Sequence, residues 1–168
     1  MPALLDWASL GDILRRAEAA RLSPSMCMAH RLCAFTAMRI GNVVNAEWRE
    51  FHLDDEQPVW IIPYKKMKVA TRDIGHRVPM CPEIADELCR WRETFGGKGF
   101  VFPSPQGGKY IGRESIEKVY RVTLALGGKH SPHGWRSAFS TLARDNGFAR
   151  DVVELALDHA HDNEVARA

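Results

Sequence analysis

The side chains best suited to chemistry are His133 and Arg136, which lie three residues apart in the segment His133-Gly-Trp-Arg136. Residues at this spacing share one face of a helix. If the segment begins a helix, the free N–H groups and the dipole at that end attract anions. Arginine grips phosphate oxygens in a bidentate fork. The pair therefore predicts a phosphate site, although the same spacing is also typical of ordinary surface pairs.

Arg39 ends a long apolar run, Leu32-Cys-Ala-Phe-Thr-Ala-Met38, which predicts that its side chain is half-buried. A buried arginine is costly unless it is paired with a carboxylate or bound to an anion. The sequence therefore allows two kinds of partner for Arg39: a bound anion, or a nearby carboxylate such as Glu47 or Glu50 in a salt bridge.

Basic residues are concentrated between positions 65 and 77, although the chain as a whole has 23 basic and 21 acidic residues and a net charge of +2. The segment contains Lys65, Lys66, Lys68, Arg72 and Arg77 against the single acidic Asp73. Such a local excess could face a phosphate backbone, and it is equally typical of the solvated tip of a hairpin.

A metal site is a weaker possibility near the end of the chain. The segment His159-Ala-His161-Asp162, together with Asp158 and His133, contains the residue types that bind zinc. Residues two apart do not share a helix face, however, which disfavours this set as a ligand cluster. The four cysteines lack the spacing of a zinc or redox motif and are expected to be reduced, buried thiols.

Length and composition indicate one ordinary domain. The 168 residues include 45% hydrophobic and 26% charged residues, close to the average for globular proteins, and no internal repeat or linker is evident. No apolar run could span a bilayer, and the first residues do not form a secretory signal. We expect a bacterial cytoplasmic protein with no membrane partner.

The pattern along the chain predicts a mainly helical α+β domain with a small antiparallel sheet near its middle. Helices are expected over residues 10–21, 26–38, 43–48, 82–92, 113–126, 133–144 and 151–157. Strands are expected at 51–53, 59–62 and 76–80, where the apolar residues change to a strand period. The helix at 26–38 is apolar nearly all round, which predicts a central position.

Taken in series, the motifs resemble the catalytic domain of the tyrosine recombinases, the phage integrase family, and most closely the integrases of prophages and genomic islands. The likeness covers nearly the whole chain. It is carried by Thr36-Ala-Met-Arg39, Trp60-Ile-Ile-Pro-Tyr-Lys-Lys-Met-Lys68, His76-Arg-Val-Pro-Met80, Phe102-Pro103, His133-Gly-Trp-Arg136 with Phe139-Ser-Thr141, and Leu157-Asp-His159.

The resemblance implies a role for each matching residue. Arg39 and Arg136 would clamp the scissile phosphate of double-stranded DNA, and Lys68 would protonate the departing 5′ oxygen. His133 would assist proton transfer, and His159 would hydrogen-bond the phosphate. Such an enzyme breaks and rejoins DNA through a 3′-phosphotyrosine, with no metal or other cofactor, and the full-length protein would be a tetramer on DNA.

Two features depart from the family pattern. Asn42 stands where an acidic residue usually orients the first arginine, so we expect Arg39 to be held by a hydrogen bond rather than an ion pair. None of the tyrosines Tyr64, Tyr110 and Tyr120 has the position of the nucleophile, which is expected just after Ala168. The 168 residues are therefore expected to be a truncated catalytic domain, inactive alone and without the N-terminal DNA-binding domains. A DNA-binding module that uses the same clamp without catalysis is the alternative.

Overall fold

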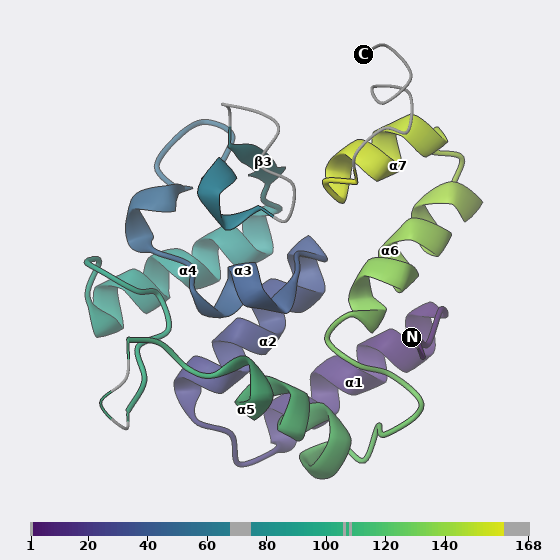
Figure 1. The fold of residues 1–168 in the computed structure, drawn as a ribbon, viewed down its shortest axis with the longest axis horizontal. Coiled ribbons are helices and arrows are strands. Elements are labelled where there is room, and N and C mark those ends of the chain that lie inside the picture. The colour runs from purple at the N-terminus through teal and green to yellow at the C-terminus, as the bar shows by residue number, and fades with distance from the viewer. Residues whose placement is uncertain (1, 68–74, 106, 108, 160–168) are drawn as a thin grey trace.

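The computed structural model describes residues 2–67, 75–105, 107 and 109–159, and it shows a mainly helical domain with one small sheet (Figure 1). This is the predicted fold class. The helices are α1 (Trp7–Ala19), α2 (Pro24–Thr36), α3 (Ile40–Val44), α4 (Pro82–Phe95), α5 (Arg113–Lys118), α6 (Gly134–Asp145) and α7 (Arg150–Ala156). The strands are β1 (Phe51–His52), β2 (Val59–Ile62) and β3 (His76–Pro79).

The first two helices begin at polar side chains that bind their free N–H groups. The Ser9 backbone N–H donates to Asp6 Oδ1 at 2.8 Å, so α1 begins at Trp7, three residues before the predicted start at residue 10. The Ser23 hydroxyl caps α2, and Pro24 occupies its first turn. The helix ends at Ala37, whose φ of 52° places it in the left-handed region. That turn points the carbonyl oxygen of Ala37 toward the functional site described below.

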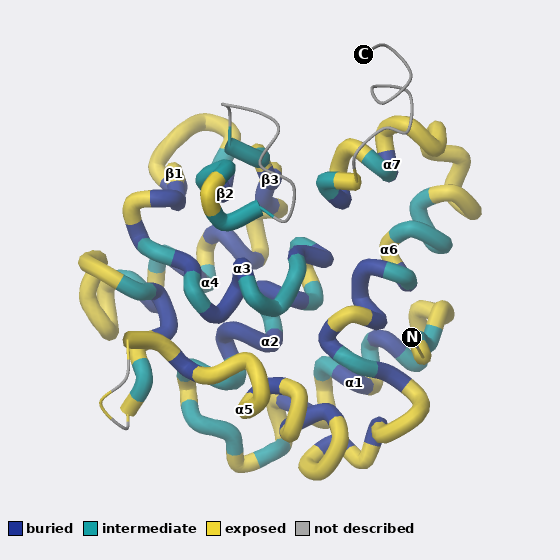
Figure 2. Tube along the Cα trace, viewed as in Figure 1, coloured by how far each residue is buried: buried dark blue, intermediate teal, exposed yellow. Residues whose placement is uncertain are grey.

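Helix α2 lies at the centre of the core, as its apolar sequence predicted. Ala29, Leu32 and Cys33 are fully buried, and α1, α3, α4 and α5 all pack against α2 (Figure 2). Cys81 is exposed, so the prediction that all the cysteines are buried is wrong for that residue. Among the helices that the structure describes, none has the length and apolarity needed to cross a bilayer.

The sheet has the order β1-β2-β3, and both pairs of strands are antiparallel. Trp60 pairs with Phe51 on one side and with Val78 on the other, and its ring is fully buried. On β3, the His76 Nε2 lies 3.2 Å from the Ala156 carbonyl oxygen. The sheet edge is thereby joined to the end of α7, which carries part of the site.

Aromatic and histidine side chains form a buried polar network beneath the start of α6. The Tyr120 hydroxyl accepts a hydrogen bond from Trp135 Nε1 and donates to His30 Nδ1 at 2.7 Å. The Leu4 N–H donates to His130 Nδ1 at 3.1 Å, and the His130 ring covers Gly134, where a Cβ would lie 2.8 Å from it. Only glycine fits at position 134, so this histidine ring sets how closely α6 approaches the core.

The two buried histidines predict that the protein loses stability in mild acid. Burial lowers the pKa of His30 and of His130 from 6.5 to about 4. Between these values the unfolded chain binds more protons than the folded chain, so the free energy of unfolding falls as the pH falls below about 6.5. The expected loss is roughly 2 kcal/mol for each histidine by about pH 5, measurable as urea unfolding at pH 7.5 and pH 5.

The His30→Gln variant should lose about 2 kcal/mol less than the wild type over the same pH interval. His52, which is exposed on β1, provides the control, and its replacement by Gln should leave the pH slope unchanged. Equal slopes in the wild type and in His30→Gln would contradict the assignment.

Candidate phosphate-binding site

Arg136 lies in the first turn of α6 and is 3% exposed. Its guanidinium donates through Nη1 to the Ala37 carbonyl oxygen at 2.9 Å and through Nη2 to the Leu157 carbonyl oxygen. The same Nη2 lies 3.1 Å from His159 Nε2. One buried side chain therefore joins the end of α2, the start of α6 and the end of α7.

Arg39 meets the same end of α7 from the other side. It precedes α3, and its Nη1 donates to Asp158 Oδ2 at 3.0 Å, while Nη2 lies 3.4 Å from the Asp158 carbonyl oxygen. About 30% of the Arg39 side chain is exposed, as expected for a half-buried group. Guanidinium carries five N–H donors, so Asp158 leaves donors on Arg39 for a further acceptor.

This ion pair corrects two expectations for Arg39. The prediction that Arg39 is held without an ion pair is wrong, because Asp158 supplies the carboxylate. The alternative partners Glu47 and Glu50 bind Lys66 instead. The Asn42 side chain is buried, and within the described residues its amide nitrogen has no partner. The orienting carboxylate therefore comes from a segment distant in sequence, not from α3.

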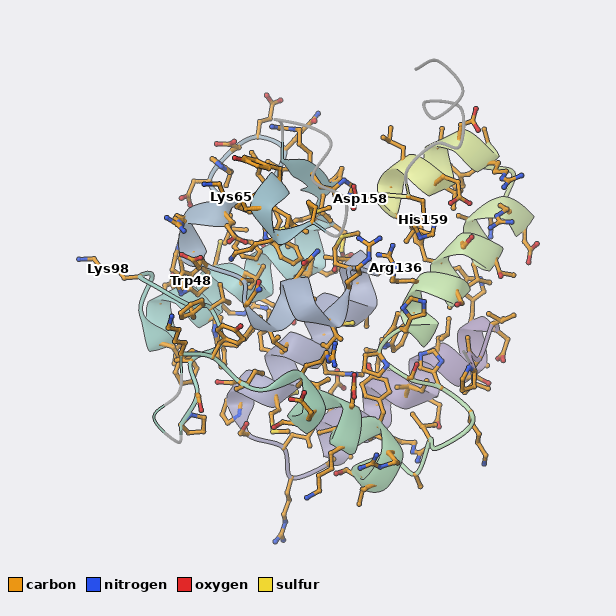
Figure 3. The ribbon with its side chains drawn as sticks, viewed as in Figure 1. Trp48, Lys65, Lys98, Arg136, Asp158 and His159 are labelled. Atoms are coloured by element: carbon orange, nitrogen blue, oxygen red, sulfur yellow. The ribbon has the colours of Figure 1, made fainter. Side chains whose placement is uncertain are left out.

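His159 turns back over the last turn of α7 because Asp158 has a φ of 52°. Its backbone N–H donates to the Glu154 carbonyl oxygen at 2.9 Å, and its Nδ1 lies 2.5 Å from Glu154 Oε2. Figure 3 shows Arg136, Asp158 and His159 gathered between α3 and the ends of α6 and α7. The hydrogen bond from His159 holds the pKa of Glu154 below its usual value of 4.5.

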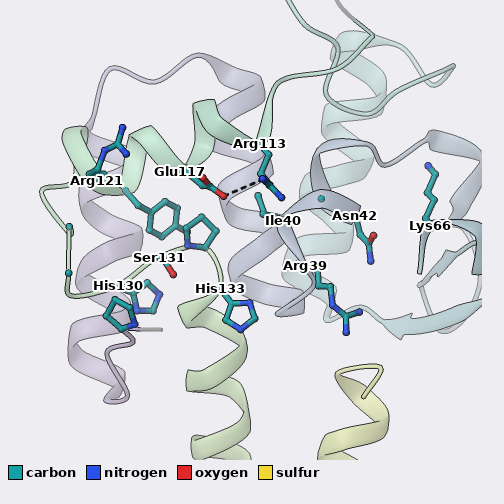
Figure 4. Close-up of a pocket in the computed structure, with 16 residues that line it drawn as sticks. Arg39, Ile40, Asn42, Lys66, Arg113, Glu117, Arg121, His130, Ser131 and His133 are labelled. Carbon is teal, nitrogen blue, oxygen red and sulfur yellow. Dashed lines mark ion pairs between the residues drawn. The ribbon is translucent and has the colours of Figure 1, made fainter. Parts of the chain in front are cut away.

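His133 immediately precedes α6, makes no capping hydrogen bond with its side chain and is exposed, so its ring is accessible to a ligand. It lines a cavity of about 630 Å³ together with Arg39 and Asn42 (Figure 4). The basic residues Lys66, Arg113 and Arg121 also line this cavity. Burial, and then the charge of Arg136, lower the pKa of His133, so the ring is mostly neutral near pH 7 and can accept a proton.

The two arginines are close neighbours, since Arg136 contacts Leu157 and Arg39 contacts the adjacent Asp158. Burial, and then the charge of Arg39, lower the pKa of Arg136 from 12.5 to about 10. Arg136 therefore remains a cation at neutral pH, and the like charges raise the attraction for an anion between them. The structure thus brings together Arg39, His133, Arg136 and His159 from the predicted set.

The two adjacent lysines of the basic segment have different environments. The Lys66 amine donates to the Asn45 carbonyl oxygen at 2.7 Å and to the carboxylates of Glu47 and Glu50. The Lys65 side chain is exposed. The predicted DNA contact of Lys66 stays a prediction, with the amine already engaged inside the fold. Lys68 and Arg72 lie outside the described residues.

Sequence reasoning missed three components of this site: the Ala37 carbonyl, Asp158 as partner of Arg39, and Glu154 as partner of His159. None of the three left a signal in the sequence: a backbone carbonyl is common to every residue, and Glu154 meets His159 at a spacing of five only because Asp158 is left-handed. For the metal alternative, no group of three metal-binding side chains occurs among the residues that the structure describes. His161 and Asp162 lie outside them.

Comparison with known proteins matches nearly the whole chain to one family. The phage integrase family profile covers residues 6–167. The prophage integrase IntA of Escherichia coli (strain K12) is 34% identical over 134 residues, which cover 79% of this chain and 31% of that protein. The integrase of Shigella phage Sf6 is 27% identical over 139 residues, covering 82% and 35%. The chain thus spans about a third of the length of these relatives.

Solved structures share the fold at lower sequence identity. The XerH site-specific recombinase bound to its difH substrate superposes with a TM-score of 0.74 at 21% identity, covering 99% of this chain and 49% of that one. The XerA recombinase superposes with a TM-score of 0.72 at 19% identity, covering 99% and 57%.

The different environments of Lys65 and Lys66 predict different effects on stability. Lys66→Met leaves the buried carboxylate of Glu50 without its cation. Breaking a buried pair costs roughly 3–5 kcal/mol, and some exposure of Lys66 reduces this to about 2–4 kcal/mol. Lys65→Met is the matched control and should change the free energy of unfolding in urea by less than about 0.5 kcal/mol. Equal losses in the two variants would contradict the network.

Proposed function

The chain belongs to the phage integrase family, and we propose that it is the catalytic domain of a site-specific DNA recombinase that integrates or excises a mobile element. The observation that supports this most directly is the convergence of Arg39 and Arg136 on residues 157–158. Two guanidinium groups that meet the same short segment can bind one phosphate together, and the DNA backbone presents phosphates in series.

In this proposal the arginine pair binds the non-bridging oxygens of the scissile phosphate. Negative charge grows on these oxygens as the phosphorus becomes pentacoordinate, and fixed cations stabilise that charge without reorganising. Arg136 is held rigidly by backbone carbonyls, so its position is set before DNA arrives. The pair therefore supplies transition-state stabilisation with no metal or other cofactor.

Proton transfer and attack complete the reaction. A tyrosine oxygen attacks phosphorus, a 3′-phosphotyrosine forms, and the bond to the 5′ oxygen breaks. The neutral His133 accepts the proton that the tyrosine hydroxyl loses, and the 5′ oxygen takes a proton from Lys68. His159 hydrogen-bonds a phosphate oxygen. Reversal of these steps by a 5′ hydroxyl of another strand rejoins the DNA.

Double-stranded DNA is the proposed partner, and the full-length protein is proposed to act on it as a tetramer. XerH is described as bound to its difH substrate before and after cleavage, and the Tn1549 transposon integrase as bound to transposon right-end DNA. We propose that the present chain is a single domain of a longer protein, and that further DNA-binding domains contribute to site recognition.

The 168-residue chain should bind duplex DNA weakly, with little sequence preference and steep loss of affinity as salt rises. Each phosphate contact contributes roughly −0.9 to the slope of log affinity against log salt concentration. Arg39→Gln should therefore lower the magnitude of that slope by about one. The measurement is fluorescence anisotropy with one duplex over a salt series.

Lys98 provides the matched control for this measurement. It is exposed and points away from the Arg136 cluster (Figure 3), so Lys98→Gln should leave the slope unchanged. Tight binding that is specific for one sequence and independent of salt would contradict the proposal, as would equal effects of the two variants.

We propose that none of the three tyrosines of the chain is the nucleophile. Tyr120 is 1% exposed and its hydroxyl is bonded to His30 and Trp135, and burial raises its pKa well above 10. Tyr110 packs against Phe100, and Tyr64 lies beneath the Lys65 amine. We therefore propose that the nucleophile is a tyrosine placed after Ala168.

A nicked suicide duplex that traps phosphotyrosine tests this placement. The 168-residue chain should give no covalent complex, because in this proposal none of its tyrosines is the nucleophile. A form extended beyond Ala168 to include the next tyrosine should give a slow-migrating complex in a denaturing gel. A covalent complex with the 168-residue chain, mapped by mass spectrometry to one of its three tyrosines, would show that the placement is wrong.

A further inference from the structure

Glu154 is a carboxylate at the site for which the proposed mechanism has no role. It lies on α7, is half-buried, and contacts His159 through two groups. Its carbonyl oxygen accepts from the His159 backbone N–H at 2.9 Å, and its Oε2 lies 2.5 Å from Nδ1 of the ring. With backbone and ring both held, the orientation of the imidazole is determined by this one residue.

The two neighbours of the ring determine which nitrogen carries its proton. A carboxylate can only accept a hydrogen bond, so Nδ1 must be the donor to Glu154. Arginine can only donate, so the Nε2 that lies 3.1 Å from Arg136 Nη2 must be an acceptor. The free protein therefore holds His159 as a neutral imidazole with its proton on Nδ1.

A phosphate oxygen accepts hydrogen bonds, so Nε2 must act as a donor to bind it, whereas Nε2 accepts from Arg136 in the free protein. Nε2 can donate to phosphate only if it gains a proton, and Nδ1 keeps its own because Glu154 faces it. Binding then converts His159 to an imidazolium, with the added proton taken from solvent and returned when DNA leaves. A carboxylate on Nδ1 stabilises that cation, as it does in other carboxylate–histidine pairs.

We propose, on the basis of the function proposed above, that Glu154 is a positioning residue for His159: it fixes the Nδ1-protonated form and stabilises the imidazolium that donates from Nε2 to the phosphate. Glu154 itself touches no DNA in this scheme. The Glu154 carboxylate acts through the His159 ring, so loss of the carboxylate changes the protonation of His159 and leaves Arg39 and Arg136 in place.

The other charged groups around His159 oppose one another. Arg136 and Arg39 are cations on the phosphate side and disfavour a further positive charge on the ring, whereas Asp158 is an anion beside them.

Two further titratable groups belong to the same cluster: His133, just before α6, and His76 on β3. Arg144 on α6 lies 3.7 Å from Oε1 of Glu154 and forms an ion pair with it. Glu154 is thus the anion in direct contact with the ring.

Nitrogen NMR of the histidine rings provides the test, because it reports which ring nitrogen is protonated. The resonance of His159 is identified by its loss in His159→Gln. In the wild type without DNA we expect a protonated Nδ1 and an unprotonated Nε2. The Glu154→Gln variant keeps the shape of the side chain but removes its charge. In this variant the pH at which half of the His159 rings are protonated should fall by about one unit or more.

Asp54→Asn is the matched control, since it removes the same charge from a carboxylate that pairs with Arg92 outside the site. It should leave the midpoint of His159 unchanged. A wild-type ring protonated on Nε2 instead of Nδ1 overturns the proposal, and this result needs no variant. An unchanged midpoint in Glu154→Gln overturns it as well.

DNA affinity separates failure of this inference from failure of the proposed function. Wild-type affinity for a short duplex should fall as the pH rises from about 6 to about 8, and Glu154→Gln should bind about tenfold more weakly near pH 7. Wild-type binding with no such pH dependence overturns the role of Glu154 alone. Absence of any DNA binding by the wild type overturns the proposed function, whatever the NMR shows.

Discussion

The site depends on the burial of one guanidinium group. Arg136 is 3% exposed, and a buried cation without acceptors would cost several kcal/mol. The chain meets this requirement with two backbone carbonyls, those of Ala37 and Leu157, which are available because α2 and α7 both end beside α6. The left-handed Ala37 turns its carbonyl inward. The same two hydrogen bonds therefore stabilise the fold and hold the Arg136 guanidinium in position to bind a phosphate.

The positions of the remaining site residues depend on the contact between Arg136 and the end of α7. Leu157 is fixed by the arginine, so Asp158 falls beside Arg39 and His159 falls beside the Arg136 guanidinium. His133 immediately precedes α6, and Arg136 lies in the first turn of that helix. The contact of His76 Nε2 with the Ala156 carbonyl oxygen joins the same segment to the sheet. Segments at the middle and the end of the chain thus meet at one group of polar contacts.

The sequence predicted the features that local chemistry determines. The three strands, the proline-led helices α2 and α4 and the central position of α2 follow from periodicity and capping residues. Spacing and burial suggested a phosphate site at His133 and Arg136 and an anion or carboxylate partner for Arg39, whereas Lys68 and His159 were implied only by the likeness to the family. Their connections could not be predicted: the partner of Arg39 is Asp158, far along the chain, and the partners of Arg136 are carbonyls, which every residue has. Such pairings depend on tertiary packing and on two left-handed residues, Ala37 and Asp158, that carry no glycine signal.

The central claim is that Arg39 and Arg136 hold one tetrahedral oxyanion between them. Crystals of the chain soaked in sodium tungstate test it directly, since tungsten is located by its anomalous scattering. The account predicts a tungstate bound by both guanidinium groups, with a histidine Nε2 of His133 or His159 within hydrogen-bond distance of an oxygen. Tungstate bound at other basic surfaces while the space between the two arginines stays empty would contradict it.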